Sequence, residues 1–395
     1  MNRWPRRWTK LAALGTVLSA GCHETRPDPA PVAHPPAAPV QNAPAPAPAP
    51  PQERADAACA APIELKPSES TPASTPVRIG SRAALRSGSR LTFTDADADG
   101  KLVLGVLGPI NEDSGANQIA LQKYLTFFKA EKADAIVVTG DVGESSASIT
   151  RVLEKLATGK IPVLAVIGNR ECESDFTEGV TAAQAKNPNI VNLNSLRVVS
   201  FPEATLVSLP GYHDPNFISC AKGCRYYKTT VDEVIQTAKA AKTPVILVSH
   251  GPPHGQGSQA LDYAPNAGGN VGDPDVLRAV REGAIAFGLF SNIKEAGARA
   301  TDAEGSTLIQ PNTPSKALYL NPGPASTDDW KMNDGTVSHG FAATLTLDAT
   351  GGKWKSFRNA ALTSAEKRQA KSLEPARPDD GAETPKAPTK TAPKK

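Results

Sequence analysis

The chain has 395 residues and a formal net charge of +3, so its charge indicates no particular partner. It contains no stripe of interleaved arginine and aromatic residues, and we therefore expect no nucleic-acid partner. Once the terminal segments described below are set aside, roughly 280 residues remain, which is enough for one large domain with a sizeable core.

The first 22 residues have the features of an export signal. Basic residues precede an apolar stretch at 11–18 that is too short to span a membrane. The letters LSAGC then resemble a bacterial lipobox, which implies that Cys22 is lipidated; ordinary secretory cleavage is the alternative. Because His23 stands where an inner-membrane retention signal has aspartate, the resemblance implies an exported protein that is lipid-anchored to the outer membrane of the cell envelope.

Two further segments have too little apolar bulk to fold. Residues 23–76 are rich in alanine and proline, with eleven prolines between Pro27 and Pro51, and we expect an extended, disordered tether. Residues 364–395 are rich in lysine, proline and acidic residues, and we expect a disordered charged tail. The folded domain is therefore predicted at 77–363.

Within this domain, short apolar runs alternate with segments of helical periodicity. Strands are predicted at 101–108, 134–141, 161–167, 204–209, 243–249 and 284–290. Helices are predicted at 116–132, 148–157, 231–242 and 273–282. Further β structure is expected around Leu308 and at 317–320, 340–348 and 353–359. The order predicts an α/β fold with a parallel βαβ core, followed by more strands than one doubly wound sheet needs.

Four cysteines besides Cys22 are present, and an even number in an exported protein favours disulfides. The letters CAKGC make a local Cys220–Cys224 bridge plausible, because a glycine lies between the two residues. Cys59 would then pair with Cys172 by elimination. Three pairings are compatible with the sequence, which does not choose among them.

Polar loops follow five of the predicted buried strands. Their sequences are, in chain order, GPINE, GDVGE, GNRE, SHGPPHG and FSNIKEAG. Ligands of open α/β sheets bind beyond the carboxyl ends of the strands. We therefore expect these loops to converge on one cleft.

The order and spacing of the loops resemble the calcineurin-like metallophosphoesterases. The motifs of that family are, in words, Asp-x-His, Gly-Asp, Gly-Asn-His, a lone His and Gly-His-x-His. The resemblance covers about residues 103–347, and Gly140-Asp141, Gly168-Asn169 and His250 stand in the family's places. It implies a four-layer αββα sandwich, in which a β sandwich is flanked by helices.

The chain departs from the family at the metal ligands. By the resemblance, two divalent metals bridged by the Gly-Asp carboxylate polarise a phosphate and generate a hydroxide. The first metal position corresponds here to Pro109, Asn111, Asp141 and Lys294. Proline offers no side-chain ligand and a lysine ammonium repels a cation, so we expect this position to be lost.

The second metal position is better preserved. It corresponds to Asp141, Asn169, His250 and Asn292, of which only the last differs from the family. One carboxylate, one imidazole and two amides form a poor transition-metal site. The cofactor is therefore either a single divalent metal (Mn, Zn or Fe) or none.

Two histidine positions of the family carry cations in this chain. Arg170 stands at the position of the general acid, and a guanidinium does not give up its proton near neutral pH. Together with Lys294 it can replace metal charge and bind a phosphate or another anion. The alternative is that one of the two pairs directly with Asp141 and fills the vacated cation site.

The predicted function is a non-catalytic binding or interaction domain on a lipoprotein with a degenerate dinuclear site. The alternative is a phosphoesterase that uses one metal or a rearranged site, and a third interpretation is a structural envelope protein with an idle cleft. The sequence indicates a lipid anchor and an anionic ligand, but no particular protein partner. Whether the protein is an enzyme stays open.

Overall fold

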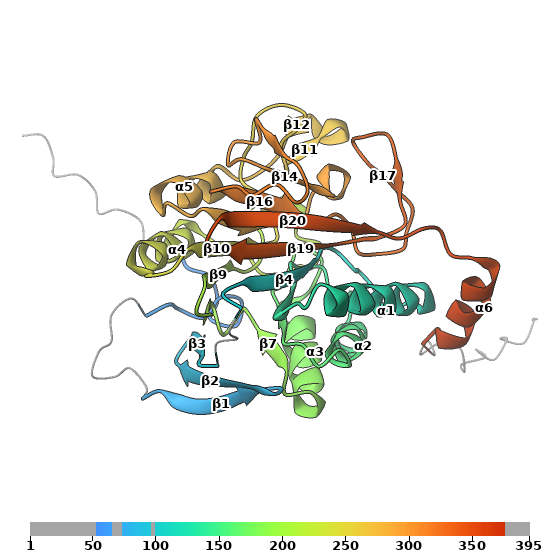
Figure 1. Ribbon diagram of the computed structural model, residues 1–395, viewed down its shortest axis with the longest axis horizontal. Helices are drawn as coiled ribbons and strands as arrows, with labels where there is room; N and C mark the ends of the chain where they lie inside the picture. Colours follow the sequence, from blue (N-terminus) through green and yellow to red (C-terminus); the bar gives the residue numbers. More distant parts are fainter. Residues whose placement is uncertain (1–52, 65–72, 96–98, 376–395) are drawn as a thin grey trace, which may run out of the picture. The chain divides into compact units, whose positions relative to one another are not determined.

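The computed structural model describes residues 53–64, 73–95 and 99–375 (Figure 1). The predicted signal, Cys22, most of the predicted tether and the end of the predicted tail lie outside the described residues. Within the described ranges, no helix combines the length and apolar character needed to cross a membrane.

One of the two large sheets of the domain has six strands. Its strand order is β20, β19, β4, β5, β6, β7. The bounds are Leu102–Leu107 for β4, Ala135–Val138 for β5, Val163–Ala165 for β6, Ile190–Asn192 for β7, Phe341–Asp348 for β19 and Gly351–Arg358 for β20. β4 to β7 run parallel, and β19 pairs antiparallel with β4. β4, β5 and β6 are continuous apolar runs because both faces of the sheet are covered.

A ten-stranded sheet forms the second half. Its order is β1, β2, β3, β8, β9, β10, β13, β16, β14, β15. The bounds are Thr75–Ile79, Arg82–Ser87, Arg90–Phe93, Val198–Ser200, Thr205–Leu209, Val245–Ser249, Phe287–Leu289, Leu318–Asn321, Arg299–Thr301 and Leu308–Ile309 in that order. Two small hairpin sheets are separate from it, formed by β11 (Tyr263–Ala264) with β12 (Gly269–Asn270) and by β17 (Trp330–Lys331) with β18 (Val337–Ser338).

The two sheets pack face to face, and helices cover both outer faces (Figure 1). Leu104 and Val106 of β4 belong to the same buried cluster as Ile246 and Val248 of β10. The six-stranded sheet is covered by α1 (Gly115–Ala130), α2 (Ser146–Ala157) and α3 (Glu173–Lys186). The ten-stranded sheet is covered by α4 (Lys228–Ala240) and α5 (Pro274–Glu282). The predicted four-layer αββα sandwich is confirmed.

The domain extends beyond the predicted limits of 77 and 363. At the N-terminal side, the buried Arg197 donates to the carbonyl of Ala61 at 3.1 Å, and Cys59 is bonded to the core. At the C-terminal side, α6 (Ser364–Leu373) packs on α1. A capping box of Thr363 and Glu366 starts this helix. The predicted tether and tail are therefore wrong for 53–64, for 75–76, where β1 begins, and for 364–375.

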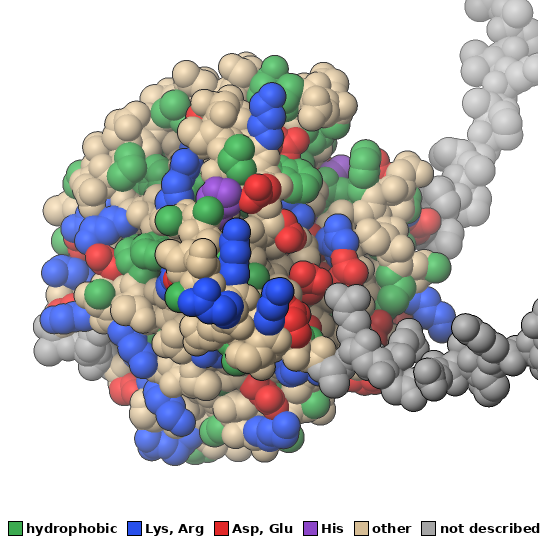
Figure 2. Space-filling model, turned by 90° about the vertical axis from the view of Figure 1, so that its right-hand side faces the viewer, with side chains coloured by type: hydrophobic (Ala, Val, Ile, Leu, Met, Phe, Trp, Pro, Cys, Tyr) green, Lys and Arg blue, Asp and Glu red, His purple; other side chains and the backbone are tan. Residues whose placement is uncertain are grey.

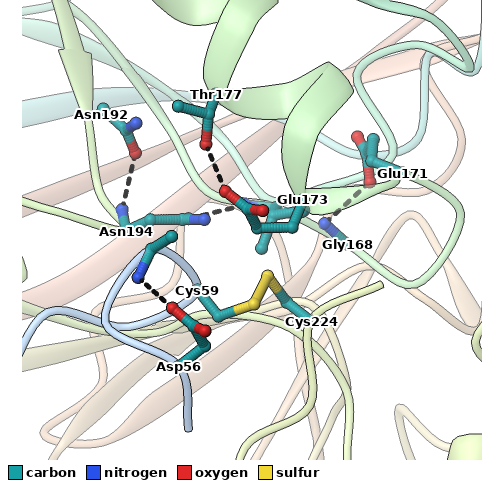
Figure 3. The surroundings of a disulfide bond; sticks show 11 residues. Asp56, Cys59, Gly168, Glu171, Glu173, Thr177, Asn192, Asn194 and Cys224 are labelled. Atoms are coloured by element: carbon teal, nitrogen blue, oxygen red, sulfur yellow. Dashed lines mark hydrogen bonds between the residues drawn. A yellow bond between two sulfur atoms is a disulfide. The ribbon is translucent and has the colours of Figure 1, made fainter. Parts of the chain in front are cut away.

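The predicted disulfide pairing is also wrong. The bonds join Cys59 to Cys224 and Cys172 to Cys220, each with Cα atoms 5.2 Å apart. A turn between the last two cysteines, in which the Gly223 N–H donates to Cys220 O, separates their side chains. Cys224 is fully buried and bonds to the N-terminal segment (Figure 3), whereas the half-buried Cys220 bonds to the residue that precedes α3.

Candidate functional site

The strand-end loops converge on one cleft, as predicted. The backbone N–H groups of Ile110 and Asn111, which follow β4, both donate to the carbonyl of Asp141 after β5 at 2.9 Å. Those of Ser291 and Asn292, which follow β13, donate to the carbonyl of His250 after β10 at 3.0 and 2.9 Å. Backbone hydrogen bonds between loops therefore hold the motifs together.

The glycines of the Gly-Asp and Gly-Asn motifs are required by close approach. Gly140 has φ of +104°, and a Cβ there would lie 2.5 Å from His250 Nδ1. A Cβ on Gly168 would lie 2.3 Å from an oxygen of Asp141. Asp141 itself has a left-handed backbone with φ of +55°, which is uncommon for a residue with a side chain. These motifs are thus a packing unit as well as a chemical one.

His250 is fully buried between hydrogen-bond acceptors. Its Nδ1 faces the carbonyl of Thr139 at 2.8 Å, and its Nε2 lies 3.0 Å from Asn169 Oδ1 and 3.4 Å from an oxygen of Asp141. The amide of Asn169 is oriented because its Nδ2 donates to Phe217 O at 2.6 Å. Since Nε2 faces two oxygens, this position suits either a proton or a cation between the three side chains.

The second metal position is only partly formed. Three of its predicted donors, on Asp141, Asn169 and His250, lie close to one another, and Asn292 lines the adjoining hollow with Asp141 and Asn169. Among the residues that the structure describes, no group of three or more His, Cys, Asp or Glu side chains is arranged to hold a metal. A cation here would depend on an amide ligand.

The residues at the first metal position do not fit a metal. The carbonyl of Pro109 accepts hydrogen bonds from the N–H groups of Ala325 and Ser326 at 2.8 and 2.9 Å, so this residue contributes backbone contacts between two loops. Asn111 has φ of +67°, and its buried Oδ1 has no hydrogen-bond partner among the residues that the structure describes. The Lys294 Nζ lies 4.8 Å from the centre of the Trp330 ring, in a cation–π contact. Of the four residues at this position, only Asp141 offers a carboxylate.

Neither cation fills the place beside Asp141. Arg170 forms an ion pair with Glu144, and only its backbone N–H bonds to Asp141, at 3.2 Å. Within the described part of the chain, Asp141 has no ion pair with a lysine or arginine. Burial acts to lower the pKa of Arg170, but Glu144 and Asp141 raise it overall. Burial lowers the pKa of Lys294, which Asp141 partly offsets and Arg170 reinforces.

Two hollows of about 320 Å³ each meet at Arg170 and Lys294. We call the first the Phe217 hollow; it is lined by Asp141, Asn169, Asn216, Phe217, Ser219 and Asn292 as well as the two cations. We call the second the Trp330 hollow. Besides the two cations, its lining includes Trp330, Asn111 and the four carboxylates of Glu112, Glu144, Asp328 and Asp329. Figure 2 shows the side of the molecule that carries α1, α6 and β17, where basic and acidic side chains adjoin.

Sequence analysis missed the residue that braces two of the motifs. The fully buried Glu171 accepts the N–H of Val142 with one oxygen and that of Gly168 with the other, at 2.9 Å for the second. Burial raises the pKa of Glu171 to about 8, and Asp141 adds to this. A carboxylate two residues after the Gly-Asn motif was the available signal. Phe217 and Trp330, at the two hollows, gave no signal in the sequence.

The sandwich and its ordered strand-end motifs define a metallophosphoesterase-type domain. Residues 113–287 match the family model described as calcineurin-like phosphoesterase. This matched segment places the folded domain in the calcineurin-like phosphoesterase superfamily. Among curated proteins, no sequence matches this chain significantly.

Several solved structures are similar to the chain. One is TT1561 of Thermus thermophilus, with a TM-score of 0.46, 12% identity and coverage of 65% of this chain and 98% of that one. A dimetal phosphatase from Danio rerio has a TM-score of 0.42, 13% identity and coverage of 66% and 99%. GAP50, the anchor in the inner membrane complex of Plasmodium, has a TM-score of 0.40, 12% identity and coverage of 70% and 96%.

Proposed function

We propose that this protein is a non-catalytic anion-binding domain on a lipid-anchored envelope protein. The observation that carries the proposal is that Arg170 and Lys294 line both hollows while neither forms an ion pair with Asp141. Their charges stand where the superfamily places histidines. A planar guanidinium and an ammonium are the groups that proteins use most to bind phosphate.

The charge balance favours the Phe217 hollow for the anion. Its charged lining consists of the two cations and the single carboxylate of Asp141. In the Trp330 hollow the same two cations face four carboxylates. A phosphate or carboxylate group would be attracted to the first and repelled by the second.

The substitutions also support a non-catalytic role. The first metal position lacks ligands, and Arg170 offers no proton to a leaving group because guanidinium remains charged. Its ion pair with Glu144 strengthens this, since the acid beside it raises the pKa further. The chain therefore keeps groups that bind an anion and lacks the general acid and three of the four ligands at the first metal position that the superfamily uses to cleave one.

The test is binding of inorganic phosphate to the full-length protein with oxidised disulfides, measured by calorimetry. Arg170→Gln and Lys294→Gln should each weaken binding at least about tenfold, because each removes a charge-assisted hydrogen bond. Arg281→Gln is the matched control, since this exposed arginine also pairs with a glutamate, Glu304. Absence of saturable binding, or equal affinity in all variants, would overturn the proposal.

The anchor has a separate test. We propose that Cys22 carries the lipid and places the domain on the outer membrane, on the strength of the LSAGC pattern. Labelling with a radioactive fatty acid should mark the wild-type protein and not the Cys22→Ser variant. Recovery of unlabelled wild-type protein in the soluble envelope fraction would contradict the anchor.

One observation favours a second candidate, a phosphoesterase with a single divalent metal. The donor atoms of Asp141, Asn169 and His250 lie close enough to share one cation. Such a cation would polarise a phosphate oxygen. Elemental analysis after incubation with manganese, zinc or iron tests this candidate, together with turnover of bis-p-nitrophenyl and p-nitrophenyl phosphate. One equivalent of metal and turnover that Asp141→Ala abolishes would establish it.

A further inference from the structure

Phe217 is unusually exposed for an aromatic residue. It is 58% exposed, more than any other large hydrophobic side chain in the described ranges. It lines the same hollow as Arg170 and Lys294. An apolar ring beside a basic pocket marks a place where a ligand can cover it.

The loop that presents Phe217 is held firmly at its backbone. Its carbonyl accepts the Asn169 amide at 2.6 Å, and the N–H of Ser219 donates to the Asn169 carbonyl at 2.8 Å. Asp214 caps the short 3₁₀ turn Pro215–Phe217, and the Cys172–Cys220 disulfide closes the loop onto the start of α3. A loop whose backbone is held in place before binding loses little entropy when a ligand packs on its side chain.

The other exposed ring at the cleft is less suited to an anion. Trp330 lies against the Lys294 ammonium and in the hollow with four carboxylates. An anion that reached this ring would enter the repulsive side of the cleft. Charge therefore selects Phe217 over Trp330 as the partner of a ring that is attached to an anion.

We propose that the cleft binds an anion carried on a flat aromatic ring, of the aryl phosphate or aryl phosphonate class. The anion lies on Arg170 and Lys294, and the ring packs on Phe217. This inference rests on the proposed function and adds the ligand class to it. A volume of about 320 Å³ accommodates a phenyl ring with one phosphate-like group.

The test compares two phosphonates that differ by the ring and cannot be hydrolysed. Phenylphosphonate should bind the full-length, disulfide-oxidised protein between about threefold and tenfold more tightly than methylphosphonate, the range expected for one aromatic pair. Phe217→Ala should remove this difference, so that the variant binds the two phosphonates with equal affinity. Leu85→Ala, at an exposed hydrophobic residue in β2, is the control.

The outcomes separate this inference from the proposed function. Failure of both phosphonates to bind would overturn both. Equal affinity of the two in the wild type, or a difference that survives Phe217→Ala, would overturn the ring contact and leave anion binding intact. Loss of the difference in Trp330→Ala but not in Phe217→Ala would place the ring in the other hollow and contradict the assignment.

Discussion

The cleft has two halves that differ in their contacts: one retains the residues of the superfamily, and in the other they are substituted. In the retained half, Asp141, Asn169 and His250 bond to one another and to the backbone, and both Asp141 and His250 are buried. In the substituted half, Arg170 and Lys294 direct their charges toward Glu144 and Trp330 at the cleft. The retained residues hold the loops together, while the substituted ones line the two hollows. Retention of a motif is therefore no proof of retained catalysis.

The largest expected effect on stability comes from removing the two disulfides. Replacing Cys172 and Cys220 with serine should cost about 4 kcal/mol of unfolding free energy, and replacing Cys59 and Cys224 about 5 kcal/mol, from spans of 48 and 165 residues. Only the replacement of Cys172 and Cys220 should weaken phosphate binding, because this disulfide holds the loop that carries Phe217. Denaturation and calorimetry on both variants check this, and equal binding losses would contradict it.

The next effect is confined to the retained half. Glu171→Ala leaves two buried N–H groups without an acceptor and should lower the unfolding free energy by about 3 kcal/mol. Glu144→Ala removes only an exposed ion pair of Arg170 and should cost less than about 1 kcal/mol. Urea denaturation of the two variants measures the difference. Similar losses would mean that the two halves contribute equally to stability.

A smaller effect distinguishes the two halves by charge. Asp141→Asn removes the carboxylate that lines the Phe217 hollow, and phosphate should bind about fivefold more tightly if the relieved repulsion is about 1 kcal/mol. If the retained half instead holds a cation that phosphate needs, the same variant should bind more weakly. Calorimetry at constant ionic strength decides the sign.

The smallest effect provides a reference outside both halves. Lys123 and the Thr363 cap lower the pKa of Glu366 to about 2 from an ordinary 4.5. A lowered pKa stabilises α6 above pH 4.5, and this contribution should be lost as the pH falls from 4.5 through about 2. Hydrogen exchange should show protection of α6 falling over this range, with α2 as the internal reference. In Glu366→Gln the dependence should disappear.

Part of the fold follows from local pattern. The buried strands β4, β5 and β10 were predictable because continuous apolar runs ended by glycine or polar residues identify strands that are covered on both faces. α3 was missed although Phe176, Val180 and Ala183 have helical spacing, and α6 was missed although Thr363 and Glu366 form a capping-box pattern. In these helices the signal was present and weak, because little apolar surface marks them.

The sequence by itself predicted a mixed α/β fold and the convergence of the strand-end loops, because these depend on residue type and on order along the chain. The sandwich was implied by the family resemblance, and the loss of the first metal position stays a prediction. The tertiary structure decided the disulfide partners, the brace by Glu171 and the partners of Arg170 and Lys294. Each of these joins residues that lie far apart in the sequence or on different loops. The sequence shows which charged residues are present. Only the packing of the loops determines that Arg170 contacts Glu144 and Lys294 contacts Trp330, and that neither pairs with Asp141.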